Sequence, residues 1–307
     1  MNIAIISSTK DKASTNIKEN LTSDFDFKQL EDNSDNNPIY QYRINDKNIK
    51  LYTIDSELIL ADNLDKKIDA DAFIFISKHR AQEGRASLTC HAIGNFGKAD
   101  KGGRGKTLCT SHSVLLKGIF IELNNNVKEP YEVTLEATHH GPFMEKPVLF
   151  VELGSNEKYW GDKNGGQIIA KSIINALKNN FDKKDDPLII HNSINKINSN
   201  NKNKKNINKE KMNENNGYES TFVIGGSHYN HIANKAMLNT NLAVGHICAK
   251  YNLENLDGGL IKEAMEKIIP KPKFVLLDWK GLGKEKQRIL EMLEKNNIEY
   301  RRSDKVF

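Results

Sequence analysis

The chain has 307 residues, of which 38% are hydrophobic and 28% are charged, and its formal net charge at pH 7 is +5. This length can bury a substantial core, and we expect one α/β domain over residues 1–307. No stretch approaches the roughly 18 apolar residues of a membrane span, and the first ten residues lack the features of a signal peptide. These observations exclude a membrane protein and predict a cytoplasmic protein. We further expect a monomer.

Positive charge is concentrated in three segments of the chain. Residues 191–217 hold six lysines and two glutamates among many asparagines, so we expect a disordered insertion there. Residues 78–106 carry seven basic and two acidic side chains, and residues 271–305 carry ten basic and six acidic ones. This asymmetry suits a polyanionic partner that binds one face, although two solvated surfaces explain it equally well.

The first third of the chain shows strand and helix patterns in alternation, which is typical of an α/β fold. Residues 13–21 have an apolar face at helical spacing, and we expect Ser14 or Thr15 to cap this helix. Residues 24–37 are polar and predict turns. Strands are predicted at residues 2–6, 50–54, 72–76 and 87–95.

Two of these strands lead to histidines. The strand at residues 72–76 ends at Ser77-Lys78-His79, and the strand at residues 87–95 delivers His91. The loop at residues 97–106 is rich in glycine and lysine, but Asp100 stands where a P-loop requires its first glycine. We therefore exclude a nucleotide triphosphatase and expect, at most, loose contacts between a flexible loop and phosphates.

The segment Thr138-His139-His140-Gly141-Pro142 follows a predicted strand at residues 131–137, in which Glu136 lies on the polar face and Leu135 on the apolar face. Neighbouring imidazoles cannot both face a core, so this turn is a candidate site. The apolar run at residues 148–151 predicts a buried strand that delivers Glu152. Open α/β sheets keep their sites at such strand ends. Between these segments, residues 111–123 predict a covering helix, and His112 at its start is expected to be a surface residue.

The last part of the chain continues the alternation. The predicted strand at residues 221–224 leads to Gly225-Gly226-Ser227, whose backbone N–H groups suit a phosphate or a developing oxyanion. His228 and His231 follow at a spacing that places both on one face of a helix. Further strands are predicted at residues 242–246 and 274–277, and helices at 257–269 and 283–296. We therefore predict a mostly parallel mixed sheet with helices on both faces.

Histidines gather at the predicted strand ends. A set of neutral imidazoles with one or two carboxylates is what zinc prefers in catalytic sites, where it lowers the pKa of a bound water to about 7. No HExxH motif is present, so proton transfer without a metal fits nearly as well. The three cysteines form no CxxC pair and are expected to be buried, which leaves histidine and carboxylate as ligands. Seven of the nine histidines lie at or just beyond strand ends: His79, His91, His139, His140, His228, His231 and His246.

Several strings in the chain together resemble the archaeal and plant-type D-aminoacyl-tRNA deacylases. They occur in the same order and cover the chain from its first strand to its last helix, except for the Asn/Lys-rich insertion. The strings are Ser77-Lys78-His79, Leu88-Thr89-Cys90-His91, Glu136 to Pro142, Glu152-Leu153-Gly154-Ser155, Gly225-Gly226-Ser227-His228-Tyr229, Gly245-His246 and Asp278-Trp279-Lys280-Gly281-Leu282.

This resemblance implies hydrolysis of the ester that joins a D-amino acid to the 3′ end of tRNA, with two zinc ions per chain. It also implies an α/β fold similar to the phosphorylase and peptidyl-tRNA hydrolase architecture. We expect catalytic roles for His140, His228 and Glu152. The expected zinc ligands are His79, His91, His139, His140, Glu152 and His231. The expected oxyanion or phosphate turn is Gly225, Gly226 and Ser227. The expected tRNA contacts are Lys78, Arg80, Arg85, Lys106, Lys280, Lys284 and Arg288.

Two alternatives stay open at this point. The first is another hydrolase on the same architecture, a peptidyl-tRNA hydrolase or a zinc-dependent amidase. The second is a tRNA-binding protein without catalysis, whose histidines are structural. The basis for choosing D- over L-amino acids is not visible in the sequence, and Phe143, Tyr159 and Tyr229 are candidate walls of the pocket.

Overall fold

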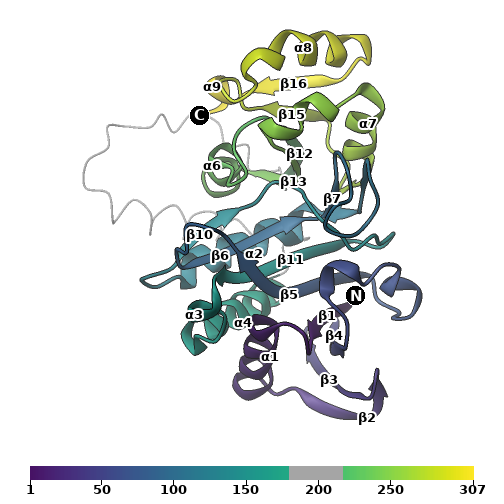
Figure 1. Cartoon of the computed structure of the whole chain (residues 1–307), viewed down its shortest axis with the longest axis vertical. Helices are drawn as coiled ribbons and strands as arrows, with labels where there is room; N and C mark the ends of the chain where they lie inside the picture. Colours follow the sequence, from purple (N-terminus) through teal and green to yellow (C-terminus); the bar gives the residue numbers. More distant parts are fainter. Residues whose placement is uncertain (180–216) are drawn as a thin grey trace.

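Two β-sheets form the framework of the protein in the computed structural model, which describes residues 1–179 and 217–307. Figure 1 shows the sheets one above the other along the long axis of the molecule. The predicted α/β class with a mostly parallel mixed sheet is confirmed, but the strands divide between two sheets. The predicted insertion at residues 191–217 lies, except for Gly217, outside the described residues.

The larger sheet has eight strands. They are β1 (Asn2–Ser8), β2 (Lys28–Ser34), β3 (Asn37–Ile44), β4 (Lys47–Ile54), β5 (Ala72–Arg80), β6 (Ser87–Ala92), β10 (Glu132–Leu135) and β11 (Val148–Ser155). Their order is β10-β6-β11-β5-β1-β4-β3-β2. Strands β11, β5, β1 and β4 run parallel, whereas β6 is antiparallel to β11. The central strand β5 is apolar because it is buried on both faces.

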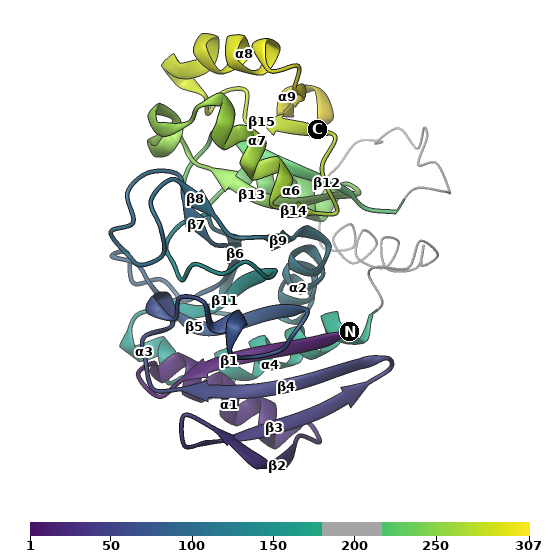
Figure 2. The same cartoon turned by 90° about the vertical axis from the view of Figure 1, so that its right-hand side faces the viewer.

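An antiparallel hairpin of β2 and β3 extends the sheet at its edge, where turns were predicted (Figure 2). Every residue of β2 is exposed or half-buried. A strand that is solvated on both faces needs no alternation of apolar and polar side chains, so the pattern gave no signal there.

Helices cover one face of the larger sheet. They are α1 (Lys12–Asp24), α2 (Ser113–Asn126), α3 (Glu157–Trp160) and α4 (Lys163–Lys178). Helix α1 is capped by Asp11 rather than by Ser14 or Thr15, since Asp11 Oδ1 accepts from the Ser14 N–H at 2.9 Å. Asp11 Oδ2 also accepts from the Lys78 N–H at 3.0 Å, which ties this helix start to the end of β5.

The second face of the larger sheet is covered by loops and short 3-10 turns. Phe73, Phe75 and Phe150 pack there against Leu58, Phe143 and other residues from these segments. No α-helix of the described residues contributes to this buried cluster, so the prediction of helices on both faces is wrong for this sheet. The loop-covered face carries the site described below.

The smaller sheet is parallel throughout. Its strands are β12 (Glu219–Ile224), β13 (Leu242–Cys248), β15 (Phe274–Leu277) and β16 (Glu299–Arg302). Their order is β13-β12-β15-β16. The accompanying helices are α6 (His231–Asn239), α7 (Gly258–Glu266), α8 (Lys286–Lys295) and α9 (Ser303–Val306). Val223 and Val244 belong to the same hydrophobic cluster as α1, α2 and α4, so apolar packing is continuous between the sheets.

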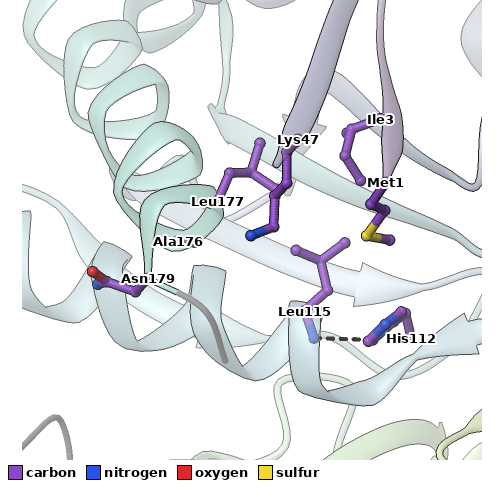
Figure 3. Close-up of a pocket in the computed structure, with 8 residues that line it drawn as sticks. All are labelled: Met1, Ile3, Lys47, His112, Leu115, Ala176, Leu177 and Asn179. Atoms are coloured by element: carbon purple, nitrogen blue, oxygen red, sulfur yellow. Dashed lines mark hydrogen bonds between the residues drawn. The ribbon is translucent and has the colours of Figure 1, made fainter. Parts of the chain in front are cut away.

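Four short strands form two pairs beside the main sheets. They are β7 (Gly94–Asn95) with β8 (Thr107–Leu108), and β9 (Ser111–His112) with β14 (Ile268–Ile269). His112 caps α2, because its Nδ1 accepts from the Leu115 N–H at 3.2 Å (Figure 3). The cavity beside it holds about 20 Å³, enough for a water molecule but not for a substrate. None of the described helices is long and apolar enough to cross a membrane.

Candidate functional site

Strands β5, β6 and β11 and the segment that follows β10 bring distant side chains together on the loop-covered face. Gly154 of β11 lies opposite His79 of β5, and Phe150 lies opposite His91 of β6. Because alternate residues of a strand share one face, Glu152 lies on the same side as these residues. The three side chains His79, His91 and Glu152 are buried.

Glu136 lies at the centre of the site. Its side chain is 0% exposed, and Oε2 accepts from His228 Nε2 at 2.8 Å. His79 Nδ1 lies 3.0 Å from Glu136 Oε1 and 3.4 Å from Glu152 Oε2. The chain beyond β10 approaches the smaller sheet here, since the Ala137 N–H donates to the His228 carbonyl. The site therefore forms where the two sheets meet.

Three imidazoles of the site are oriented by backbone carbonyls. The Nδ1–H groups of His91, His139 and His140 donate to the carbonyls of Ala92, Ala137 and Gly141, at 3.1, 2.8 and 2.5 Å. When such a ring is neutral, its Nε2 presents a lone pair. His91 Nε2 is buried without a hydrogen-bond partner. A second-shell carbonyl on the opposite ring nitrogen is the arrangement found behind metal-bound histidines.

Burial and charge set different protonation states for these groups. Burial lowers the pKa of His79, but the carboxylates of Glu136 and Glu152 outweigh burial and raise it to about 11. Burial and the neighbouring His91 lower the pKa of His140 to about 4. Burial raises the pKa of Glu152, but the neighbouring imidazoles of His79 and His91 bring it down to about 2. At neutral pH the site holds charged carboxylates, an imidazolium and a neutral His140.

Side chains of the site form three overlapping groups whose ligand atoms lie within 4.8 Å of one another. The groups are His91 with His139 and His140, Glu136 with His139 and His228, and His79 with Glu136 and Glu152. Glu136 Oε1 is a second buried atom without a well-aligned hydrogen bond. A buried imidazole nitrogen without a hydrogen bond, among further imidazoles and carboxylates, fits a metal such as zinc.

Known proteins are similar to this sequence over nearly its whole length. A sequence model described as D-aminoacyl-tRNA deacylase matches residues 66–301. A protein named D-aminoacyl-tRNA deacylase from Pyrococcus abyssi is 30% identical over 297 residues, which cover 94% of this chain and 95% of the relative. One of the same name from Methanosarcina acetivorans is 31% identical over 317 residues, covering 99% and 93%. This chain belongs to the D-aminoacyl-tRNA deacylase family.

The resemblance inferred from the motifs is thus confirmed. A crystal structure of a conserved protein of unknown function also has this fold, with a TM-score of 0.78 and 27% sequence identity. The alignment covers 100% of this chain and 96% of that chain.

Not every predicted zinc ligand of this deacylase lies at the site. His231 is exposed on the first turn of α6 and joins none of the three groups. It does not share a helix face with His228, because the helix begins only at His231. His246 is buried between the Thr138 hydroxyl and the Cys109 carbonyl, at 3.1 and 3.0 Å, so it has a structural role.

The structure argues against an oxyanion role for the glycine turn. The Gly225 N–H already donates to the Cys248 carbonyl at 2.8 Å. The carboxylate of Asp278 lies beside Gly226, where a Cβ would stand 2.7 Å from its Oδ2, so negative charge is disfavoured. The Ser227 hydroxyl donates to the Tyr229 carbonyl at 2.5 Å.

The predicted tRNA-binding side chains differ in whether they are already paired within the fold. Arg288 is used inside the fold, because its guanidinium binds the carbonyls of Leu253 and Leu256 and the Glu285 carboxylate. Lys78 lies within 4.0 Å of carboxylates from Glu57 and Asp11, and Arg85 pairs with Glu83. The exposed cations among the predicted contacts are Arg80, Arg85, Lys106, Lys280 and Lys284.

Of the predicted pocket walls, Tyr229 lies in the site. Its hydroxyl is 2.8 Å from His79 Nε2. Tyr159 packs against Tyr131, and Phe143 packs beneath the guanidinium of Arg104. The loop at residues 97–106 is packed rather than free, because Gly103 lies against Gly141 in the histidine turn.

We expect Gly154→Ala to disturb the site. A Cβ at Gly154 would stand 2.7 Å from His79 Cβ and 2.7 Å from Ser87 Oγ, so the His79 ring must shift. We expect a loss of stability of about 1–3 kcal/mol and at least a roughly ten-fold drop in kcat/KM. Thermal unfolding and steady-state deacylation measure the two effects. Gly161→Ala is the matched control, because its Cβ meets only the flexible end of Lys12; equal losses in both variants would contradict the packing argument.

Proposed function

We propose that this chain hydrolyses the ester between a D-amino acid and the 3′ end of tRNA, with zinc bound in the site. Membership of the deacylase family supports the reaction. The observation that supports zinc is the set of three Nε2 lone pairs, from His91, His139 and His140, each oriented by a carbonyl behind the ring. We also expect a cytoplasmic monomer.

We assign a zinc ion to His91, His139 and His140. His139 Nδ1 is bound to the Ala137 carbonyl, so this ring offers one lone pair and ligates one ion only. A second ion, which the family resemblance implies, would therefore rely on Glu136 and Glu152 with His79. When bound, zinc supplies a water of lowered pKa and polarises the ester carbonyl.

Two further side chains, His228 and Tyr229, supply a proton acceptor and a hydrogen-bond donor. His228 is the site imidazole most open to a substrate, with its side chain 32% exposed. Its Nε2–H donates to Glu136, which leaves Nδ1 as the proton acceptor and fixes the ring. Tyr251 places its hydroxyl 3.0 Å from this Nδ1. Tyr229 accepts from His79 Nε2–H, so its own O–H is free to donate towards the ester.

The proposal is tested by assaying the purified protein with D-tyrosyl-tRNA and with N-acyl-aminoacyl-tRNA. We expect release of D-tyrosine, no release of the N-acyl amino acid, and loss of activity in a chelator that zinc restores. The opposite substrate preference would identify a peptidyl-tRNA hydrolase. Binding of tRNA without hydrolysis and without zinc in elemental analysis would identify a non-catalytic tRNA-binding protein.

A further inference from the structure

A surface groove of about 620 Å³ lies at the ends of β5 and β11, beside the His/Glu site but not within it. It is lined by Arg80, Gln82, Asn156, Lys158 and Trp160, among others. Side chains alternate along a strand, so His79 points to the loop-covered face and Arg80 to the face on which α3 lies. The two sites are joined through Trp160, whose Nε1–H donates to the His79 carbonyl at 2.8 Å.

The groove carries positive charge that the fold does not neutralise. Arg80 and Lys158 form no ion pair with a carboxylate in the described ranges 1–179 and 217–307, whereas the neighbouring Lys78 and Arg85 do. Glu157 is the one carboxylate in the lining. Two free cations at an open groove attract a phosphate backbone.

The groove also offers a surface for stacking. The guanidinium of Arg80 lies 5.2 Å from the centre of the Trp160 ring, and the Lys158 ammonium lies 5.0 Å from that of Tyr159. Trp160 is buried, so its ring supports Arg80 from below while Arg80 stays exposed. Unpaired RNA bases stack on guanidinium planes of this kind. The amides of Gln82 and Asn156 add donors and acceptors for base edges or sugars.

We propose that this groove binds the single-stranded nucleotides immediately upstream of the terminal adenosine of the aminoacyl-tRNA, while the ester lies at the His/Glu site. This inference rests on the proposed function. The Cα atoms of His79 and Arg80 are about 3.8 Å apart, but their side chains point to opposite faces of the sheet, so adjacent nucleotides reach both by crossing the end of the strand. The 3′ end would pass over the tip of β5 between them.

The test compares two substrates in the double variant Arg80→Ala/Lys158→Ala. D-tyrosyl-tRNA contains the upstream nucleotides, and D-tyrosyl-adenosine, esterified at the ribose, lacks them. We expect KM for D-tyrosyl-tRNA to rise roughly ten-fold, with a much smaller rise for D-tyrosyl-adenosine. The control Lys171→Ala/Lys262→Ala removes the same charge from exposed positions of α4 and α7.

An equal rise in KM for both substrates, or as large a rise in the control, would overturn the proposal. A parent protein that does not hydrolyse either substrate would instead refute the proposed function. The groove is then tested by fluorescence anisotropy with an unacylated RNA that ends in CCA. Weaker binding by the Arg80/Lys158 double variant than by the parent and the control supports the groove, and equal binding overturns it.

Discussion

Glu136→Gln is expected to lower kcat/KM by roughly 10- to 100-fold, because Glu136 holds two histidines of the site in place. Its carboxylate faces His79 through Oε1 and His228 through Oε2. A glutamine offers a single oxygen, and its NH₂ group would face one of these N–H donors. We expect the free energy of unfolding to fall by about 1–3 kcal/mol. Steady-state deacylation and thermal unfolding measure the two losses.

Glu132→Gln is the control for this experiment. Glu132 lies four residues earlier, at the start of the strand β10 that Glu136 directly follows, but its side chain is exposed. Both substitutions change one carboxylate to an amide, so they differ only in the surroundings. If Glu136→Gln were as active as Glu132→Gln, the central role of Glu136 in the site would be refuted.

Glu136 was missed as a site residue because the strand pattern placed it on the polar face with Glu132. Burying a carboxylate is costly unless charged or hydrogen-bonding partners accompany it. Here the partners come from far along the chain: His79 precedes Glu136 by 57 positions, and His228 follows it by 92. A local pattern of apolar and polar residues contains no information on such partners. The signals present were the closeness of Glu136 to the His139-His140 pair and its place at the start of the string Glu136 to Pro142 that resembles the deacylase family.

The clustering of histidines was predicted, but strand ends explain it only in part. Strands β6 and β10 run antiparallel to β5 and β11, so their carboxyl ends lie at the opposite edge of the sheet. His79 and His91 meet because they lie opposite Gly154 and Phe150, on either side of Glu152 and on the same face of the sheet. His231 lies apart from the site, because the position of a residue on a helix does not determine which part of a sheet its side chain will face. Arg288 is used inside the fold, and two of its three partners are backbone carbonyls, which no sequence pattern marks.

The division into two sheets could not be predicted from the sequence either. Each strand is indicated by its own apolar run, but the run does not determine which other strand it pairs with. Strand β12 pairs with β13 and β15 and not with β10. The segment that follows β10 nevertheless contacts the smaller sheet, because the Thr138 N–H donates to the Ile247 carbonyl of β13. The site depends on this arrangement, because Glu136 comes from the larger sheet and His228 from the loop after β12.

His140→Ala is expected to abolish turnover and to remove bound zinc. Burial keeps the His140 ring neutral, with a pKa of about 4, and Nδ1 donates to the Gly141 carbonyl, so Nε2 is available as a ligand. Loss of a ligand exceeds the 10–100-fold effect of an outer-shell partner, so kcat/KM should fall by more than roughly 100-fold. Elemental analysis gives the zinc content, and steady-state assays give kcat/KM.

Two further variants make this result interpretable. The backbone of His140 has a φ of +50°, a conformation that asparagine tolerates better than alanine, so His140→Asn keeps the turn while removing the imidazole. His231→Ala removes an imidazole that the structure leaves exposed and apart from the site. We expect His140→Asn to lose zinc and activity and His231→Ala to keep both. Of these two rings, only His140 lies where three imidazole lone pairs converge. If His231→Ala lost zinc and both His140 variants kept it, the metal would bind elsewhere.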